Sequence, residues 1–205
     1  MGAALPAGFF ARDAVRVARA LLGCVLETRV RGVVTAGRIV EVEAYVGPHD
    51  PAAHGFRNRR SARNASMFRG PGIAYVYFIY GMHWCFNAVT GREGVPAAVL
   101  VRALEPVAGL ATMRRRRHTD DDRLLCAGPG RLCQALGITG AMDGLRLDGP
   151  RLRIWPPARA PVRSPVVTSR IGITRAADWP LRFAEAGSRW TSRPEPQGGS
   201  GRDRK

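Results

Sequence analysis

Apolar and polar residues alternate along residues 38–46, RIVEVEAYV, as they do in a β-strand with one buried face. Successive side chains of a strand point to opposite sides. One face therefore carries Val40, Val42, Ala44 and Val46, and the other Ile39, Glu41, Glu43 and Tyr45. Carboxylates are rarely buried without a partner. Two of them on one face of a strand are an unusual filling for a protein interior, and the question is what they face.

Apolar residues recur at helical spacing in three segments. Residues 13–22 predict a helix, for which Asp13 is a suitable N-cap. A second helix is predicted over residues 105–117, because Pro106 is tolerated in a first turn. A shorter helix is expected at 129–136.

Strand patterning dominates the middle of the chain. The aromatic and β-branched run AYVYFIY at 74–80 predicts a strand, and the pattern resumes after Gly81. Residues 75–89 are therefore interpreted as a hairpin with YGMH, residues 80–83, near its tip. Other strands are expected at 24–30, at 97–104 and, as a short strand, at 170–174, RIGIT.

These elements together predict an α+β fold. A chain of 205 residues is long enough for one domain with a real core and short for two. Glycine, proline and arginine make residues 47–72 loop-like, and no repeat or linker divides the chain. We expect a single domain over residues 1–192 and a disordered basic tail over 193–205.

The charge balance changes the picture by favouring a polyanionic partner. Lysine and arginine total 32 against 16 acidic residues, a formal net charge of +16. Nucleic acid is the first expectation and an anionic membrane surface the second. Only Lys205 is a lysine. A GC-rich genome explains the choice of arginine over lysine, but it does not explain a twofold excess of basic residues.

The cysteines and the N-terminal segment predict a soluble cytoplasmic protein. The four cysteines show no paired spacing of the kind that binds zinc, so we expect reduced core thiols. The start MGAALPAGFF lacks the basic region of a secretory signal. No apolar run approaches the roughly 20 residues that span a bilayer.

Several polar and aromatic residues could together line a cleft. They lie on the strand at 38–46, the following turn, the hairpin and the strand at 97–104, and they are Glu43, Tyr45, His54, Tyr77, Tyr80, Asn87 and Arg102. A carboxylate beside an arginine stays ionised and can activate water. Aromatic faces can hold a purine ring, and an amide can test the ring's edge by hydrogen bonds.

Four blocks of the sequence resemble the alkyladenine (3-methyladenine) DNA glycosylases of vertebrates and many bacteria. They are GRIVEVEAYVGPHDPAAH, MFRGPGIAYVYFIYGMHWCFN, AAVLVRALEP and CAGPGRLCQALGI, and the similarity runs in order from about residue 20 to 192. The resemblance implies a curved, mostly antiparallel sheet with a protruding hairpin and flanking helices. It also implies excision of alkylated or deaminated purines by base flipping, without a cofactor or metal.

The resemblance also suggests roles for individual residues of the cleft. Glu43 matches the residue that activates water, and Arg102 matches the arginine that helps to position that water. Asn87 matches the asparagine that excludes normal guanine by clashing with its exocyclic amine. The walls between which the flipped base stacks correspond to Tyr45, His54 and Tyr77.

Further roles are implied for the hairpin tip and the neighbouring loop. Tyr80 matches the residue that fills the gap left in the duplex, with Met82 and His83 beside it in the minor groove. Glu41 has no role in the resemblance, and we expect a structural hydrogen-bonding one. The sequence departs from bacterial relatives at His49 and Gly55, where they more often have Glu and Ser, which puts the substrate range in question.

Two other functional classes are compatible with parts of the sequence. A metal-dependent nuclease could use Glu41, Glu43, His49, Asp50 and His54, although their spacing matches no known ligand set. A non-catalytic module that binds RNA or DNA would explain the charge but not a glutamate–arginine pair in the cleft.

The lack of lysine bears on the mechanism that the resemblance implies. Glycosylases that also cut the strand commonly attack the sugar with a lysine amine. Lys205, in the expected disordered tail, cannot be held in a pocket, and arginine is not deprotonated in proteins. The N-terminal amine is the one remaining alternative, and nothing in the sequence places it near Glu43. We therefore expect a monofunctional enzyme. Its expected partner is double-stranded DNA that contains damaged purines, and its expected state is a monomer. Its expected substrates are 3-methyladenine and 7-methylguanine, with hypoxanthine and ethenoadenine as further candidates, and its expected location is the bacterial nucleoid.

Overall fold

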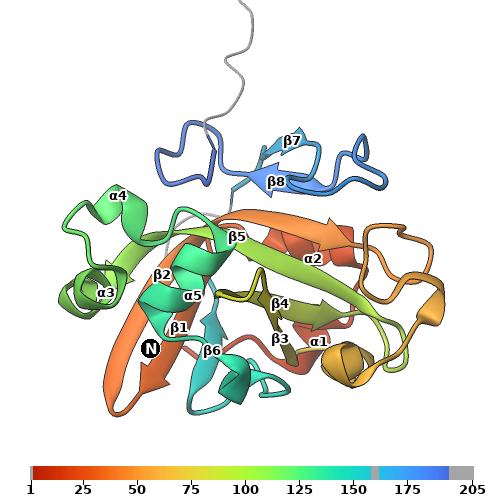
Figure 1. Ribbon diagram of the computed structural model, residues 1–205, viewed down its shortest axis with the longest axis horizontal. Helices are drawn as coiled ribbons and strands as arrows, with labels where there is room; N and C mark the ends of the chain where they lie inside the picture. The colour runs from red at the N-terminus through yellow and green to blue at the C-terminus, as the bar shows by residue number, and fades with distance from the viewer. Residues whose placement is uncertain (1, 158–161, 194–205) are drawn as a thin grey trace, which may run out of the picture.

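A computed structural model describes residues 2–157 and 162–193 of the chain. An antiparallel sheet of eight strands forms its centre, in the order β3-β4-β5-β2-β1-β6, with β8 pairing to β2 and β7 to β8 (Figure 1). The strands are β1 (Val25–Val30), β2 (Val33–Tyr45), β3 (Ala74–Ile79), β4 (His83–Thr90), β5 (Ala97–Ala108), β6 (Leu152–Trp155), β7 (Val166–Thr168) and β8 (Arg182–Ala184). The α+β fold with a curved antiparallel sheet, expected from the sequence, is confirmed.

Helices cover the sheet and close its ends. They are α1 (Ala7–Phe10), α2 (Ala14–Leu21), α3 (Leu110–Arg117), α4 (Asp122–Leu125) and α5 (Pro129–Leu136), with the 3-10 turns η1 (Phe56–Asn58), η2 (Ala62–Phe68) and η3 (Gly140–Met142). The Asp13 side chain accepts a hydrogen bond from the Arg16 N–H, which confirms it as the N-cap of α2. None of the helices in the described ranges is long and apolar enough to cross a membrane.

The longest strand, β2, begins earlier than the sequence suggested. A two-residue turn joins it to β1, and Arg31 and Gly32 in this turn both have positive φ, as a type I′ turn requires. Gly37, one residue before the predicted strand at 38–46, lies inside β2. A Cβ atom there would lie 2.7 Å from the Leu104 Cβ, so glycine permits the close approach of β5.

Pro106 belongs to a strand, so the predicted helix over residues 105–117 was wrong in its first part. Strand β5 continues to Ala108, and helix α3 begins only at Leu110. Pro106 lies opposite Gly37 at a register shift, where a missing N–H is tolerated. An ion pair between Glu105 and Arg38, at 2.5 Å, holds this end of β5 against β2.

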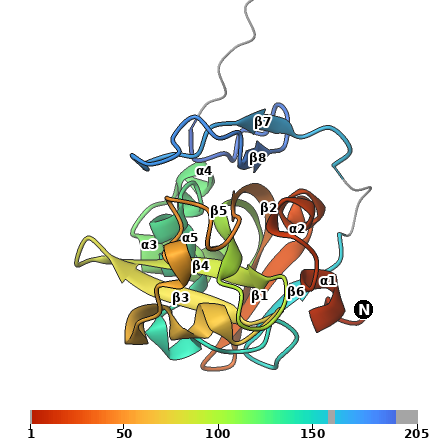
Figure 2. The ribbon, with the colours of Figure 1, turned by 90° about the vertical axis from the view of Figure 1, so that its right-hand side faces the viewer.

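The predicted strand at 170–174 was also wrong. Residues 169–176 form bends and irregular backbone, and β7 and β8 flank this segment instead. The Ile171 N–H is directed to the Glu43 carboxylate rather than to a neighbouring strand. The chain from 162 to 193 forms a layer beside the end of the sheet, anchored by the pairing of β8 with β2 (Figures 1 and 2).

A register shift in β2 corrects the predicted alternation of residues 38–46. Pairing with β5 shifts between Ile39 and Glu41, as at a β-bulge. Ile39 consequently packs in the main hydrophobic cluster with Val42 and Ala44, and it does not share the face of Glu41 and Glu43. The two glutamates are thus left among polar partners.

The hairpin expected at 75–89 is confirmed as β3 and β4. It extends beyond the rest of the sheet (Figure 2). The helix expected at 129–136 is α5, which packs against β4 and β5. Of the predicted basic tail, residues 194–205 lie outside the part of the chain that the structure describes.

Candidate functional site

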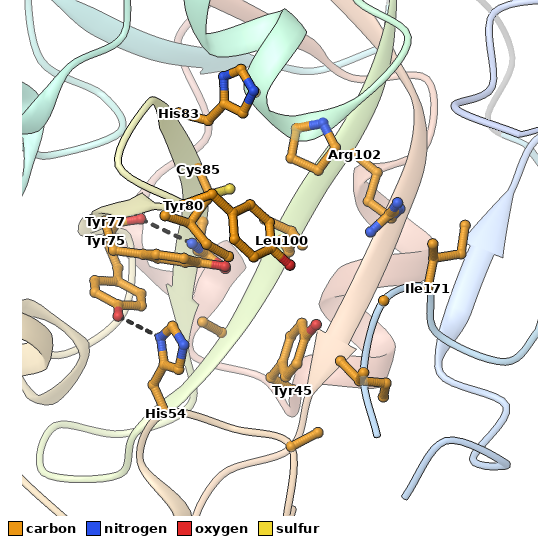
Figure 3. A pocket seen from close by; sticks show the side chains of 18 of the residues that line it. Tyr45, His54, Tyr75, Tyr77, Tyr80, His83, Cys85, Leu100, Arg102 and Ile171 are labelled. Atoms are coloured by element: carbon orange, nitrogen blue, oxygen red, sulfur yellow. Dashed lines mark hydrogen bonds between the residues drawn. The ribbon is translucent and has the colours of Figure 1, made fainter. Parts of the chain in front are cut away.

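A cavity of about 390 Å³ opens between the hairpin, the end of β2, the middle of β5 and residues 171–173. Most of the predicted site residues line it, namely Tyr45, His54, Tyr77, Tyr80, His83, Asn87 and Arg102 (Figure 3). Glu43 is not among the lining residues and is fully buried behind them. Met82 lines a neighbouring cavity of about 480 Å³ between the hairpin and α5.

Cross-strand pairing in the hairpin brings one set of side chains to the cavity. Tyr75 lies opposite Asn87, and Tyr77 opposite Cys85. Side chains of directly opposed residues share a face of a sheet. All four of these residues line the cavity, although Tyr75 and Cys85 were not among the predicted site residues.

Three aromatic rings form one wall of the cavity. The Tyr75 and Tyr77 rings stack with centroids 5.2 Å apart, and the His54 ring lies edge-on to Tyr77 at 4.6 Å. His54 Nδ1 and the Tyr75 hydroxyl form a hydrogen bond of 2.7 Å, visible in Figure 3. Burial and the nearby Arg63 charge lower the pKa of His54. Neutral imidazole is therefore favoured in this wall.

Tyr45 forms the opposite wall, across the cavity from these rings (Figure 3). Its hydroxyl donates to Glu43 Oε2 at 3.1 Å. Behind the ring, the Arg170 guanidinium carbon lies 4.7 Å from the ring centroid. Arg170 is held in turn by both oxygens of Asp50, in an ion pair with no exposed surface. This contact ties the loop after β2 to the C-terminal layer.

Glu43 is fully buried and accepts contacts from three directions. The Ile171 N–H donates to Oε1 at 2.7 Å, Arg102 Nη1 lies 3.1 Å from the same oxygen, and the Tyr45 hydroxyl donates to Oε2. Burial raises the pKa of Glu43, and these three partners oppose the rise. The result is a fixed carboxylate that is a stronger base than one in water.

Glu41, two residues earlier on β2, is also fully buried. Its carboxylate accepts hydrogen bonds from Arg102 Nε, from Arg182 Nε, and from the backbone and side chain of Ser192. Burial by itself raises the pKa of Glu41, but Arg182, Ser192 and Arg102 together hold it below its ordinary value. Glu41 is therefore ionised. It is not among the residues that line the cavity.

The hairpin tip combines exposure with an unusual backbone. Tyr80 and Gly81 both have positive φ, and the Met82 N–H donates to the Ile79 carbonyl, as in a type I′ turn. Tyr80 is 77% exposed and Met82 68%. A bulky residue at positive φ is uncommon. His83 is exposed on one side, and its ring packs against Gly130 of α5 on the other.

The residues of the alternative nuclease site have other partners. Arg102 and Arg182 contact Glu41, Arg170 contacts Asp50, and His54 contacts Tyr75. No group of three or more His, Cys, Asp or Glu side chains is suitably placed to hold a metal ion within residues 2–157 and 162–193. The four cysteines are free and buried.

Sequence reasoning missed the contribution of the C-terminal layer. Ile171, Arg170, Arg182 and Ser192 supply donors to the carboxylates on β2 and in the following loop. Arginine is abundant throughout the chain, and a backbone N–H has no signature in a sequence. The one available signal was that two buried carboxylates need more than a single guanidinium.

Comparison with known proteins gives a consistent result. The profile of the family described as "Methylpurine-DNA glycosylase (MPG)" matches residues 8–189. A protein of Methanoculleus marisnigri is 57% identical over 193 residues, covering 92% of this chain and 98% of its own length. Proteins of Rhodopseudomonas palustris (strain BisB18) and Nitrosospira multiformis are 48% and 49% identical, over 95% of this chain and 93% and 96% of their own lengths. All three carry the name "putative 3-methyladenine DNA glycosylase".

Proposed function

The chain belongs to the methylpurine-DNA glycosylase family, and we propose that it flips damaged purines out of duplex DNA and hydrolyses their N-glycosidic bond by a monofunctional mechanism. Its activity is that of a DNA-3-methyladenine glycosylase in base-excision repair. The observation that carries the mechanism is the buried carboxylate of Glu43 directly behind the wall of an aromatic cavity.

Glu43 is the general base of this reaction. An ionised carboxylate has about four lone-pair sites. The Ile171 N–H and the Tyr45 hydroxyl each occupy one, and Arg102 Nη1 lies 3.1 Å from the oxygen that Ile171 contacts. A second lone pair of Oε2, the oxygen that Tyr45 contacts, is free to accept a proton from a water molecule near the cavity wall. Because the carboxylate is fixed and partly desolvated, it orients that water and takes its proton more readily than an exposed glutamate does.

The flipped purine lies between the walls of the cavity. Tyr45 is on one side, and Tyr77 and His54 are on the other, so the flat ring has an aromatic face on each side. Asn87 lies at the edge of this space and tests the groups that the purine carries. Tyr80 enters the space that the base leaves in the duplex. Unstacking costs a few kcal/mol, and less for a damaged base pair, which favours lesions.

The charge of the base decides how easily it leaves. In 3-methyladenine and 7-methylguanine the ring already carries positive charge, so it departs as a neutral base without protonation. The sugar then becomes cationic, and water guided by Glu43 adds to its anomeric carbon. Neutral lesions such as hypoxanthine need an acid at the leaving nitrogen, and they are excised more slowly.

The decisive experiment replaces Glu43 by glutamine and measures single-turnover excision from duplexes with one 7-methylguanine. The Glu43→Gln variant retains shape and loses the base, so excision falls by at least about 100-fold. Binding to a duplex with an abasic-site analogue should be retained. Equal excision rates for the variant and the wild type would exclude Glu43 as the base.

A panel of duplexes with single lesions defines the substrate range. The wild-type protein should excise the two cationic methylpurines fastest and leave an intact abasic strand. A parallel assay with a chelator tests the nuclease alternative, which requires activity to disappear when divalent metal is removed.

A further inference from the structure

Two fully buried carboxylates meet the same guanidinium. Arg102 Nε donates to Glu41 Oε1 at 3.0 Å, and Arg102 Nη1 lies 3.1 Å from Glu43 Oε1. Arg102 is itself only 7% exposed, so it has little contact with solvent. Glu41 holds Arg102 through Nε, and this contact therefore sets the direction in which Nη1 points toward Glu43.

Glu41 is held from three segments of the chain at once. Besides Arg102 on β5, it accepts from Arg182 Nε on β8 at 2.7 Å. The Ser192 N–H and hydroxyl donate to it at 2.5 and 2.8 Å. With this many donors the Glu41 side chain has one geometry, and it cannot contact a substrate in the cavity. Its effect on the reaction must therefore be indirect, either through its hydrogen bond with Arg102 or through its charge.

The charges of this cluster cancel. Glu41 and Glu43 carry two negative charges, and Arg102 and Arg182 carry two positive ones. Neutralising Glu41 would leave a net positive cluster beside a sugar that becomes cationic as the base departs. Like charges at close range in a low-dielectric site are strongly unfavourable.

We propose that Glu41 is a positioning residue, which orients Arg102 toward Glu43 and cancels one positive charge beside the developing sugar cation. This inference rests on the proposed function, because it presupposes that Glu43 guides water to the sugar. It assigns a part in the reaction to a side chain that never touches the substrate.

The charge of Glu41 also acts on Glu43 as a base. Burial is the main cause of the raised pKa of Glu43, and the neighbouring Glu41 charge adds to it. Removing that charge lowers the pKa of Glu43 and weakens the base. Removing the positive charge of Arg182 should instead raise the pKa of Glu43. The acidic limb of the pH–rate profile, where Glu43 becomes protonated, reports both effects.

Few other groups near Glu43 titrate in the acidic range. The groups that surround it are Tyr45 and Glu41 on β2, Cys85 on β4, Arg102 on β5, Arg182 opposite it on β8, and Arg170 behind Tyr45. Burial raises the pKa of Tyr45 and Cys85, and arginine stays charged. His54 lines the same cavity and has a lowered pKa, so the titration of Glu43 must also be followed directly.

The test compares Glu41→Gln, Arg182→Gln and the double variant by single-turnover excision of 7-methylguanine across pH. Glu41→Gln should slow excision at least tenfold and move the acidic limb about one pH unit lower, as the loss of a neighbouring charge does. Arg182→Gln should move the limb higher, and the double variant should return it close to the wild-type position. Carbon-13 titration of the Glu43 carboxyl in the free proteins should show the same three directions.

Glu105→Gln is the matched control. Like Glu41, Glu105 pairs with an arginine across the β2–β5 strand pair, but it does not line the cavity. Its acidic limb should not move. Melting temperatures are measured for every variant. If Glu41→Gln lowers only the melting temperature and leaves both the limb and the Glu43 titration unchanged, the inference is overturned. Failure of the proposed function appears separately, as undiminished excision by Glu43→Gln.

Discussion

A single hydrogen bond decides which atoms of Asn87 face the cavity. Its side-chain nitrogen donates to the Tyr75 carbonyl at 3.1 Å, across the β3–β4 pair. The residue is 4% exposed, so the amide has little room to rotate. A rigid amide at the edge of the proposed base site can exclude a purine by shape, whereas a mobile amide would move aside.

Replacing Asn87 by serine should relax discrimination against undamaged guanine, because a smaller side chain removes the clash with the exocyclic amine. A steric difference of this size in a pocket is worth roughly 10- to 200-fold. The measurement is guanine release from undamaged duplex, compared with 7-methylguanine excision by the same preparation. Background guanine release with intact lesion excision would show that Asn87 is not the filter.

At the scale of elements, the hairpin depends on neighbours that brace it from one side. The Trp84 ring packs on Phe78, with ring centroids 4.7 Å apart, and against Gly140 of η3. His83 packs against Gly130, at the start of α5, where a Cβ atom would lie 2.9 Å from its ring. The exposed tip is therefore carried on a supported strand pair, which suits the wedge role proposed for Tyr80.

Replacing Tyr80 by serine should impair excision from duplex DNA more than from single-stranded DNA, since only the duplex leaves a gap to fill. The stacking of an aromatic side chain on a base is worth about 1–3 kcal/mol, so a loss of roughly 5- to 150-fold is expected on the duplex. Val33→Ser, an exposed apolar residue at the start of β2, serves as the control and should change neither rate. Equal losses on both substrates for Tyr80→Ser would argue against intercalation.

At the scale of the whole molecule, part of the basic charge is used in internal ion pairs. Arg38 pairs with Glu105 and Glu185, and Arg114 with Asp122. The remaining excess nevertheless leaves the formal net charge at +16. Such a charge steers the protein to DNA and makes binding sensitive to salt. Because arginine supplies all of the basic side chains except Lys205, this positive charge comes with almost no amines.

Sodium borohydride added during turnover should trap no covalent protein–DNA adduct. A Schiff base needs a deprotonated amine, and Lys205 is the only lysine in the sequence. Arginine remains protonated in proteins. The assay is electrophoresis of labelled duplex after reduction, with a lysine-dependent glycosylase as the positive control. An adduct above the level of a Glu43→Gln sample would contradict the monofunctional mechanism.

The sequence by itself determined the elements whose signals are local. Helix α2 follows from helical spacing and an N-cap, and the β3–β4 hairpin from two apolar runs around a glycine. The predictions of α2 and of the hairpin succeeded because their signals lie within a few residues of the feature predicted. The resemblance of four sequence blocks to a known family singled out several residues that line the cavity, and their roles stay predictions.

Only the tertiary structure decided where strands end and what the buried carboxylates contact. Pro106 lies in a strand because Gly37, some 70 residues earlier, allows β2 to approach closely, and Ile39 turns to the core because pairing with β5 shifts. The donors to Glu41 and Glu43 come in part from Ile171, Arg182 and Ser192, which are far away in sequence. Desolvation requires that a buried charge find partners, but it does not specify which part of the chain provides them.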